Sequence, residues 1–69
     1  MKRQPMTDSV SVEVDGKLFD GTYSVQSKVV TVDSGYGSGS TQLGGSPAHV
    51  VARILLREIV QGAKARGEL

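Results

Sequence analysis

"SVSVEVDGKLFDGTYSV", residues 9–25, is the stretch that decides the fold. In its first half, valine alternates with serine or glutamate, and this period of two is typical of a half-buried β-strand. Asp15-Gly16 follows, and it suits a two-residue type I′ turn because both central residues of that turn need positive φ. The stretch therefore predicts a β-hairpin that presents Val10, Val12 and Val14 on one face.

The pairing of the strands follows from this turn. A second turn around Gln26-Ser27 leads into a third strand, so strands are expected near residues 9–14, 17–25 and 28–33. The predicted cross-strand pairs are Val12–Phe19, Val10–Gly21, Val30–Tyr23 and Val32–Gly21. This register gathers the large apolar side chains on one face, and a slip by one residue would move them to the other.

The C-terminal third of the chain has the pattern of an amphipathic helix over residues 47–65. Ser46 is a suitable N-cap, Pro47 suits the first helical position, and Gly67 suits a stop. At 100° per residue, one apolar stripe is formed by Ala48, Val51, Ala52, Leu55 and Ile59.

These elements predict a two-layer α+β fold, a three-stranded antiparallel β-meander with one C-terminal α-helix on one face, in the order β-β-β-α. The predicted domain spans residues 9–66, with a disordered arm at 1–8, a Gly/Ser-rich loop at 34–46 and a tail at 67–69. The residues expected to be buried are Val12, Phe19, Tyr23, Val30, Val51, Leu55 and Ile59.

Composition restricts how such a domain can be stabilised. With 69 residues and no cysteine, the chain has a small core and no disulfide, which favours reinforcement by a second subunit. One histidine and scattered acids leave little with which to bind a metal, and neither a metal nor a cofactor is expected. The N-terminal segment has no apolar run and no stretch is long enough to span a bilayer, which is typical of a soluble, cytoplasmic bacterial protein.

The glycine-rich segment resembles a phosphate-binding loop only in part. "GSTQLGGS", residues 39–46, fits the pattern G-x-x-x-x-G-K-[ST] except that Gly45 replaces the lysine. Alternation of glycine through Gly35, Gly37 and Gly39 either allows close approach of the backbone to a neighbour or prevents order. The segment is interpreted as a flexible connection, and the candidates for a weak anion or partner contact are Gly39, Gly44, Gly45 and Ser46.

Two features predict a protein partner. The helix carries more apolar surface than three strands require, and the flanking candidates for an interface are Val50, Ile54, Leu56 and Val60. The first and third strands are expected to form the edges of the sheet, where unpaired backbone groups can accept another chain. A homodimer, or a complex with another protein, is therefore expected through either the helix flank or a sheet edge.

Positive charge gathers near the C-terminus, where residues 47–69 contain four basic and two acidic side chains. A basic stripe on the helix with one free aromatic ring could contact nucleic acid, and the candidate residues are Arg53, Arg57, Lys64 and Tyr36. The alternative is a solvated helix face with cations near its C-terminus.

The sequence shows no complete catalytic motif. His49 is expected at the surface, because a catalytic histidine needs a nucleophile and an orienting acid around it. The sequence therefore predicts a non-enzymatic protein-interaction or self-associating module, with nucleic-acid binding through the basic helix face as the alternative and an enzyme as a third hypothesis.

Overall fold

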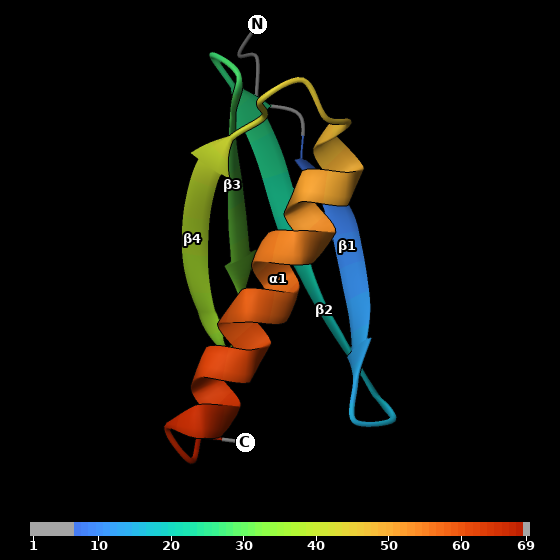
Figure 1. Cartoon of the computed structure of the whole chain (residues 1–69), viewed down its shortest axis with the longest axis vertical. Helices are drawn as coiled ribbons and strands as arrows, with labels where there is room; N and C mark the ends of the chain where they lie inside the picture. The colour runs from blue at the N-terminus through green and yellow to red at the C-terminus, as the bar shows by residue number, and fades with distance from the viewer. Residues whose placement is uncertain (1–6, 69) are drawn as a thin grey trace, which may run out of the picture.

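The computed structural model describes residues 7–68 as one antiparallel sheet covered by one helix. The elements are β1 (Thr7–Val14), β2 (Lys17–Gln26), β3 (Val29–Ser34), β4 (Gly37–Gln42) and α1 (Ala48–Ala65). The strands lie in the order β1-β2-β3-β4, and α1 runs diagonally across one face, from β1 toward β4 (Figure 1). The predicted α+β class with a C-terminal helix is confirmed, but the prediction of three strands is wrong, since there are four.

The first hairpin has the predicted turn and register. Asp15 and Gly16 both have positive φ, 54° and 78°, as a type I′ turn requires. The turn places Val12 opposite Phe19 and Val10 opposite Gly21. The alternation of valine with polar residues therefore determines which face of β1 is buried.

The second turn lies one residue later than predicted. Ser27 and Lys28 occupy it with φ of 53° and 65°, so Val25, rather than Tyr23, faces Val30 and Tyr23 faces Val32. This displaces each pair by two residues, and a shift of two leaves every side chain on its own face. The predicted partners are wrong, whereas the predicted faces are right.

The segment expected to be a loop over residues 34–46 contains the fourth strand. The Ser34 hydroxyl accepts a hydrogen bond from the Tyr36 amide at 3.2 Å and donates one to the Gly37 carbonyl at 2.9 Å. This turn returns the chain so that Val32 pairs with Gly39. The expectation of a flexible connection is therefore wrong for residues 37–42.

The glycines of β4 face α1 and make room for it. A Cβ atom at residue 39 would lie 3.7 Å from Leu55 Cδ2 and 3.8 Å from Ile59 Cδ1, and one at residue 37 would lie 3.3 Å from Ile59 Cγ2. Leu55 and Ile59 thus fill the space that side chains on β4 would otherwise occupy. The close approach that the alternating glycines allow is an approach to the protein's own helix.

The core lies between α1 and the first three strands. Leu56, Val60, Val30 and Val32 are its largest fully buried side chains. Leu56 and Val60 therefore belong to the core, and their assignment to an interface on the helix flank is wrong. Tyr23, Leu55 and Ile59, expected to be buried, are partly exposed and pack against the core.

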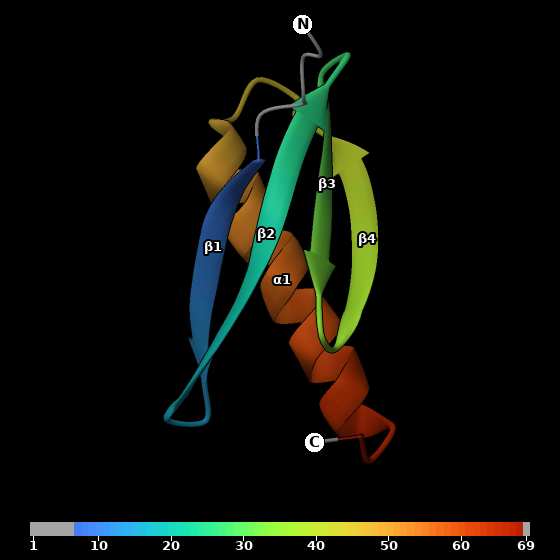
Figure 2. The ribbon, with the colours of Figure 1, turned by 180° about the vertical axis from the view of Figure 1, so that it is seen from behind.

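The opposite face of the sheet is mostly polar, with Leu18 and Val29 among its polar residues, and is not covered by any other element of the described chain (Figure 2). By strand alternation, the hydroxyl residues on this face are Thr7, Ser9, Ser11, Thr22, Ser24, Thr31, Ser38 and Ser40. All hydrophobic packing between layers therefore takes place on the face that α1 covers.

The two ends of α1 differ from each other in how well they match the predictions. Pro47 is the N-cap and provides no side-chain cap, while the Ser46 amide donates to the Leu43 carbonyl at 3.2 Å, so the predicted Ser46 cap is wrong. At the other end Gly67 has φ of 77°, and the Glu68 amide reaches the Ala63 carbonyl at 2.9 Å. This is a Schellman motif, and it confirms the stop at Gly67.

The predicted arm at residues 1–8 is too long by two residues, because β1 begins at Thr7. The rest of that arm, residues 1–6, and the last residue of the predicted tail, Leu69, lie outside the described residues.

We predict that Leu56→Ala lowers the free energy of unfolding by about 2–5 kcal/mol, because it leaves a cavity at the centre of the core. Leu55→Ala should cost less, since Leu55 is partly exposed, and Ile54→Ala should change stability by less than about 0.5 kcal/mol. Urea unfolding followed by circular dichroism measures all three variants. Equal losses for Leu55 and Leu56 would contradict this assignment of the core.

A second prediction compares two glycines on the core face of the sheet. A Cβ at residue 21 would lie 2.6 Å from the Asp33 carbonyl oxygen, so Gly21→Ala should destabilise the protein by about 1–3 kcal/mol. Gly39→Ala meets only ordinary contacts and removes the glycine penalty in a strand, so it should be neutral or stabilise by up to about 1 kcal/mol. Thermal unfolding of both variants tests this order, and a reversed order would contradict the described packing.

Candidate interaction groove

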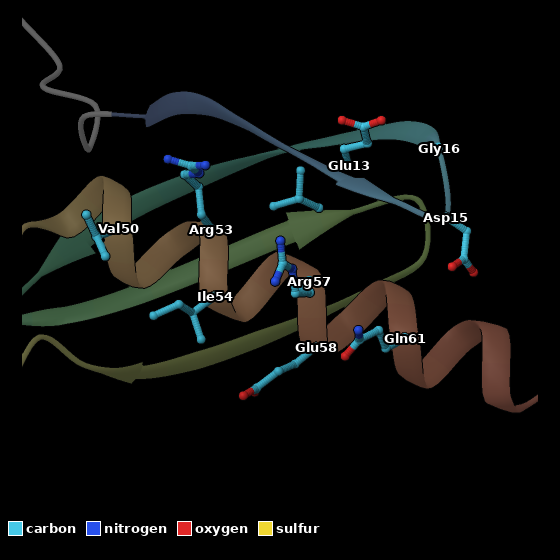
Figure 3. Close-up of a pocket in the computed structure, with 10 residues that line it drawn as sticks. Glu13, Asp15, Gly16, Val50, Arg53, Ile54, Arg57, Glu58 and Gln61 are labelled. Carbon is cyan, nitrogen blue, oxygen red and sulfur yellow. The ribbon is translucent and has the colours of Figure 1, made fainter.

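Two hollows follow one another along the edge of β1 that faces away from β2. The larger has a volume of about 740 Å³ and lies between the end of β1 and the outer side of α1 (Figure 3). The smaller, of about 420 Å³, follows β1 itself from Ser9 to Glu13 and reaches His49. Because both are lined by Val12, Glu13 and Arg53, they adjoin each other, and we call them together the β1 groove.

The edge of β1 supplies backbone groups to this groove. Val14 pairs with Lys17 across the two-residue turn, and in an antiparallel ladder hydrogen-bonded and non-hydrogen-bonded pairs alternate from there. The N–H and C=O groups of Ser9, Ser11 and Glu13 therefore point away from β2. They form the row of donors and acceptors that an additional strand needs.

The helix supplies two cations to the same groove. Arg53 and Arg57 lie one turn apart on α1 and project toward the side where β1 lies (Figure 3). Ile54 and Glu58 line the same hollow further from β1. Within residues 7–68, the two ion pairs are Lys64–Asp15 and Arg66–Glu68, so neither Arg53 nor Arg57 has a carboxylate partner.

Apolar side chains border the cations. Val50 and Ile54 are 37% and 55% exposed and lie four residues apart, which places them next to each other on the outer side of α1. Of the four residues predicted to form an apolar interface, these two are accessible, while Leu56 and Val60 are in the core. The groove thus combines a strand edge, two guanidinium groups and a short apolar ridge.

The other residues proposed to contact nucleic acid are engaged elsewhere. Lys64 forms an exposed ion pair with Asp15 at the β1–β2 turn. The Tyr36 ring packs edge-to-face on Phe19, with centroids 5.2 Å apart and an interplanar angle of 84°. Of the predicted set, the structure brings only Arg53 and Arg57 together as unpaired cations.

The candidate anion-binding residues do not form one loop. Gly39 lies in β4, whereas Gly44, Gly45 and Ser46 lie in the connection to α1, beside Ser27 and Lys28. The amide of Ser46 donates to the Leu43 carbonyl within that connection. The segment that resembles a phosphate-binding loop is therefore split between a strand and a turn.

Few other groups suggest chemistry. His49 is exposed in the first turn of α1, and no three metal-ligating side chains cluster within the described part of the chain. Hydrogen bonds from Arg66 lower the pKa of the exposed Glu68 carboxyl, and the same contact raises the pKa of Arg66. In residues 7–68, no helix combines the length and hydrophobicity that crossing a bilayer requires.

Comparison with known proteins adds no assignment. No protein-family model matches the chain, and neither the curated proteins nor the solved structures contain a significant match. The function therefore has to be inferred from the β1 groove.

Proposed function

We propose that this chain is a non-enzymatic protein-interaction module that binds its partner along the β1 groove. The observation that carries the proposal is the position of a strand edge, which no other strand of residues 7–68 adjoins at Ser9, Ser11 and Glu13, beside two exposed apolar residues of the helix, Val50 and Ile54. A strand edge provides directional hydrogen bonds, and an apolar ridge provides burial. The two together are what a protein partner can use.

The charged groups of the groove support binding over catalysis. The guanidinium groups of Arg53 and Arg57 are hydrogen-bond donors without an acceptor, so they suit the orientation of carboxylates or phosphates rather than the removal of a proton. Glu13 lies on the opposite face of β1 from Val12, by strand alternation. The helix side of the groove therefore presents two guanidinium groups, apolar surface and one carboxylate, Glu58, while the Asp15 carboxylate at the turn is paired with Lys64.

Self-association is one form of this proposal, but the predicted interfaces need revision. Leu56 and Val60 are buried, so they cannot meet a second copy. Thr31 lies in β3, which is paired on both sides, so the third strand is not an edge as was predicted. A dimer would have to use β1, β4, or the ridge formed by Val50 and Ile54.

Nucleic-acid binding remains the alternative proposal, because Arg53 and Arg57 are exposed and unpaired within residues 7–68. It now depends on two cations, since Lys64 is paired and Tyr36 packs on Phe19. Two phosphate contacts give little affinity at physiological salt. The geometry therefore favours a protein partner.

We predict that a photo-crosslinking amino acid at position 54 captures a protein in cells that express the chain, because Ile54 borders the groove. The same amino acid at Thr22, on the uncovered face of the sheet, is the matched control. Mass spectrometry of the product distinguishes another protein from a second copy. Equal labelling from both positions, or none from position 54, would contradict the proposal.

The alternative has its own prediction. If nucleic acid binds, amide resonances of Arg53 and Arg57 should shift on addition of DNA or RNA at low salt, and the effect should fall steeply with salt. Replacing Arg53, Arg57 and Lys64 by glutamine together should abolish the shifts. No shift at low salt would eliminate the alternative.

A further inference from the structure

We infer that the partner contributes an extended, acidic segment that adds to the sheet as a fifth strand beside β1. This inference rests on the proposed function and specifies the chemistry of the partner. It follows from three properties of the β1 groove: its backbone edge, the spacing of Arg53 and Arg57, and the distribution of charge around them.

The backbone edge determines the form of the segment. Outward-pointing N–H and C=O groups recur at Ser9, Ser11 and Glu13, in the two-residue repeat of a β-strand. The smaller hollow lies along the same five residues, which span about 17 Å. A helix cannot satisfy such a row of backbone groups, whereas an extended segment of about five to seven residues can.

Strand alternation determines which side chains of the segment meet the helix. Residues of the added strand that lie opposite Val10 and Val12 share the face of those valines, which is the face that α1 covers. Every second side chain would therefore project toward Arg53 and Arg57, and the others would project over the uncovered face of the sheet.

The spacing of the cations fits two acids on one such strand. Residues four apart on a helix rise by about 6 Å, and side chains two apart on a strand are separated by about 6.8 Å. Carboxylates at alternate positions could thus each meet one guanidinium, in the bidentate geometry that arginine favours. Beyond these acids, apolar side chains would contact Val50 and Val12.

Charge argues against a second copy as the occupant. Pairing β1 with its copy about a two-fold axis would place both helices on the same face of one continuous sheet. The two Arg53 side chains would then approach the same seam, where β1 offers Asp8 and three valines, while Glu13 lies on the other face. A second copy would therefore bring one carboxylate, Asp8, together with a further Arg53 and Arg57. An acidic segment brings carboxylates without further arginines.

The test uses a blocked nonapeptide, Thr-Val-Thr-Glu-Ser-Glu-Thr-Val-Thr, whose pattern is symmetric and so suits either strand direction. We expect its addition to the ¹⁵N-labelled chain to shift the amides of Ser9, Ser11 and Glu13 together with those of Arg53 and Arg57. A peptide with both glutamates replaced by lysine should bind at least about tenfold more weakly, because it brings cations to the two arginines.

Variants of the protein locate the effect. The double variant Arg53→Gln with Arg57→Gln should bind the acidic peptide about tenfold or more weakly than the original chain does. Lys28→Gln with Arg66→Gln removes the same charge outside the groove and should leave affinity unchanged. Ser11→Pro removes one outward amide and should also weaken binding, with a dispersed spectrum confirming that the variant is folded.

The inference is overturned if the acidic and lysine peptides bind equally, if the shifts map to β4, or if the double arginine variant binds as well as the original chain. A dimer of the unmodified chain in sedimentation that Ser11→Pro dissociates would also overturn it, because a second copy would then occupy the edge. If the acidic peptide does not bind but position 54 still gives a specific cross-link, the acidic strand is rejected and the proposed function is retained. Absence of that cross-link would reject the proposed function itself.

Discussion

Packing of α1 across one face of the sheet is the interaction on which everything else in this molecule depends. Leu56 and Val60 lie fully buried against Val30 and Val32, and the other face of the sheet is mostly polar. Without the helix, the valines of the meander would be exposed to water, and an isolated sheet of this kind gains little stability. The same helix forms one wall of the β1 groove, so one element both covers the core and shapes the proposed binding surface.

The sequence predicts the parts of this fold that follow from period and turn chemistry. Alternation of valine along residues 9–14 and the Asp15-Gly16 turn specify the first hairpin and its buried face. The second turn has neither glycine nor asparagine, so its position could not be read to the residue. β4 could not be predicted from hydrophobic alternation, because glycine occupies the core-facing positions and the apolar atoms that cover it come from α1.

The candidate site was predictable to a similar degree. The helical pattern shows that α1 has a wide apolar sector. Which residues of that sector are most buried depends on the strands that lie under the helix. The unexpected fourth strand extends the surface under the helix, so Leu55 and Ile59 lie over β4 while Leu56 occupies the centre of the core. Val50 and Ile54 remain exposed. That Arg53 and Arg57 lie beside the edge of β1 can be seen only in the folded structure.

The glycines of β4 also bear on how the molecule opens. Gly37 and Gly39 contribute no side chain of their own to the core, so the strand is retained by its ladder with β3 and by Leu55 and Ile59 above it. Detachment of the C-terminal half of α1 would remove that cover at once. We therefore expect the last strand and the last turns of the helix to open together, so that their amide hydrogens become accessible to exchange at the same time. The link between this part of the molecule and the Asp15-Gly16 turn is the exposed Lys64–Asp15 ion pair.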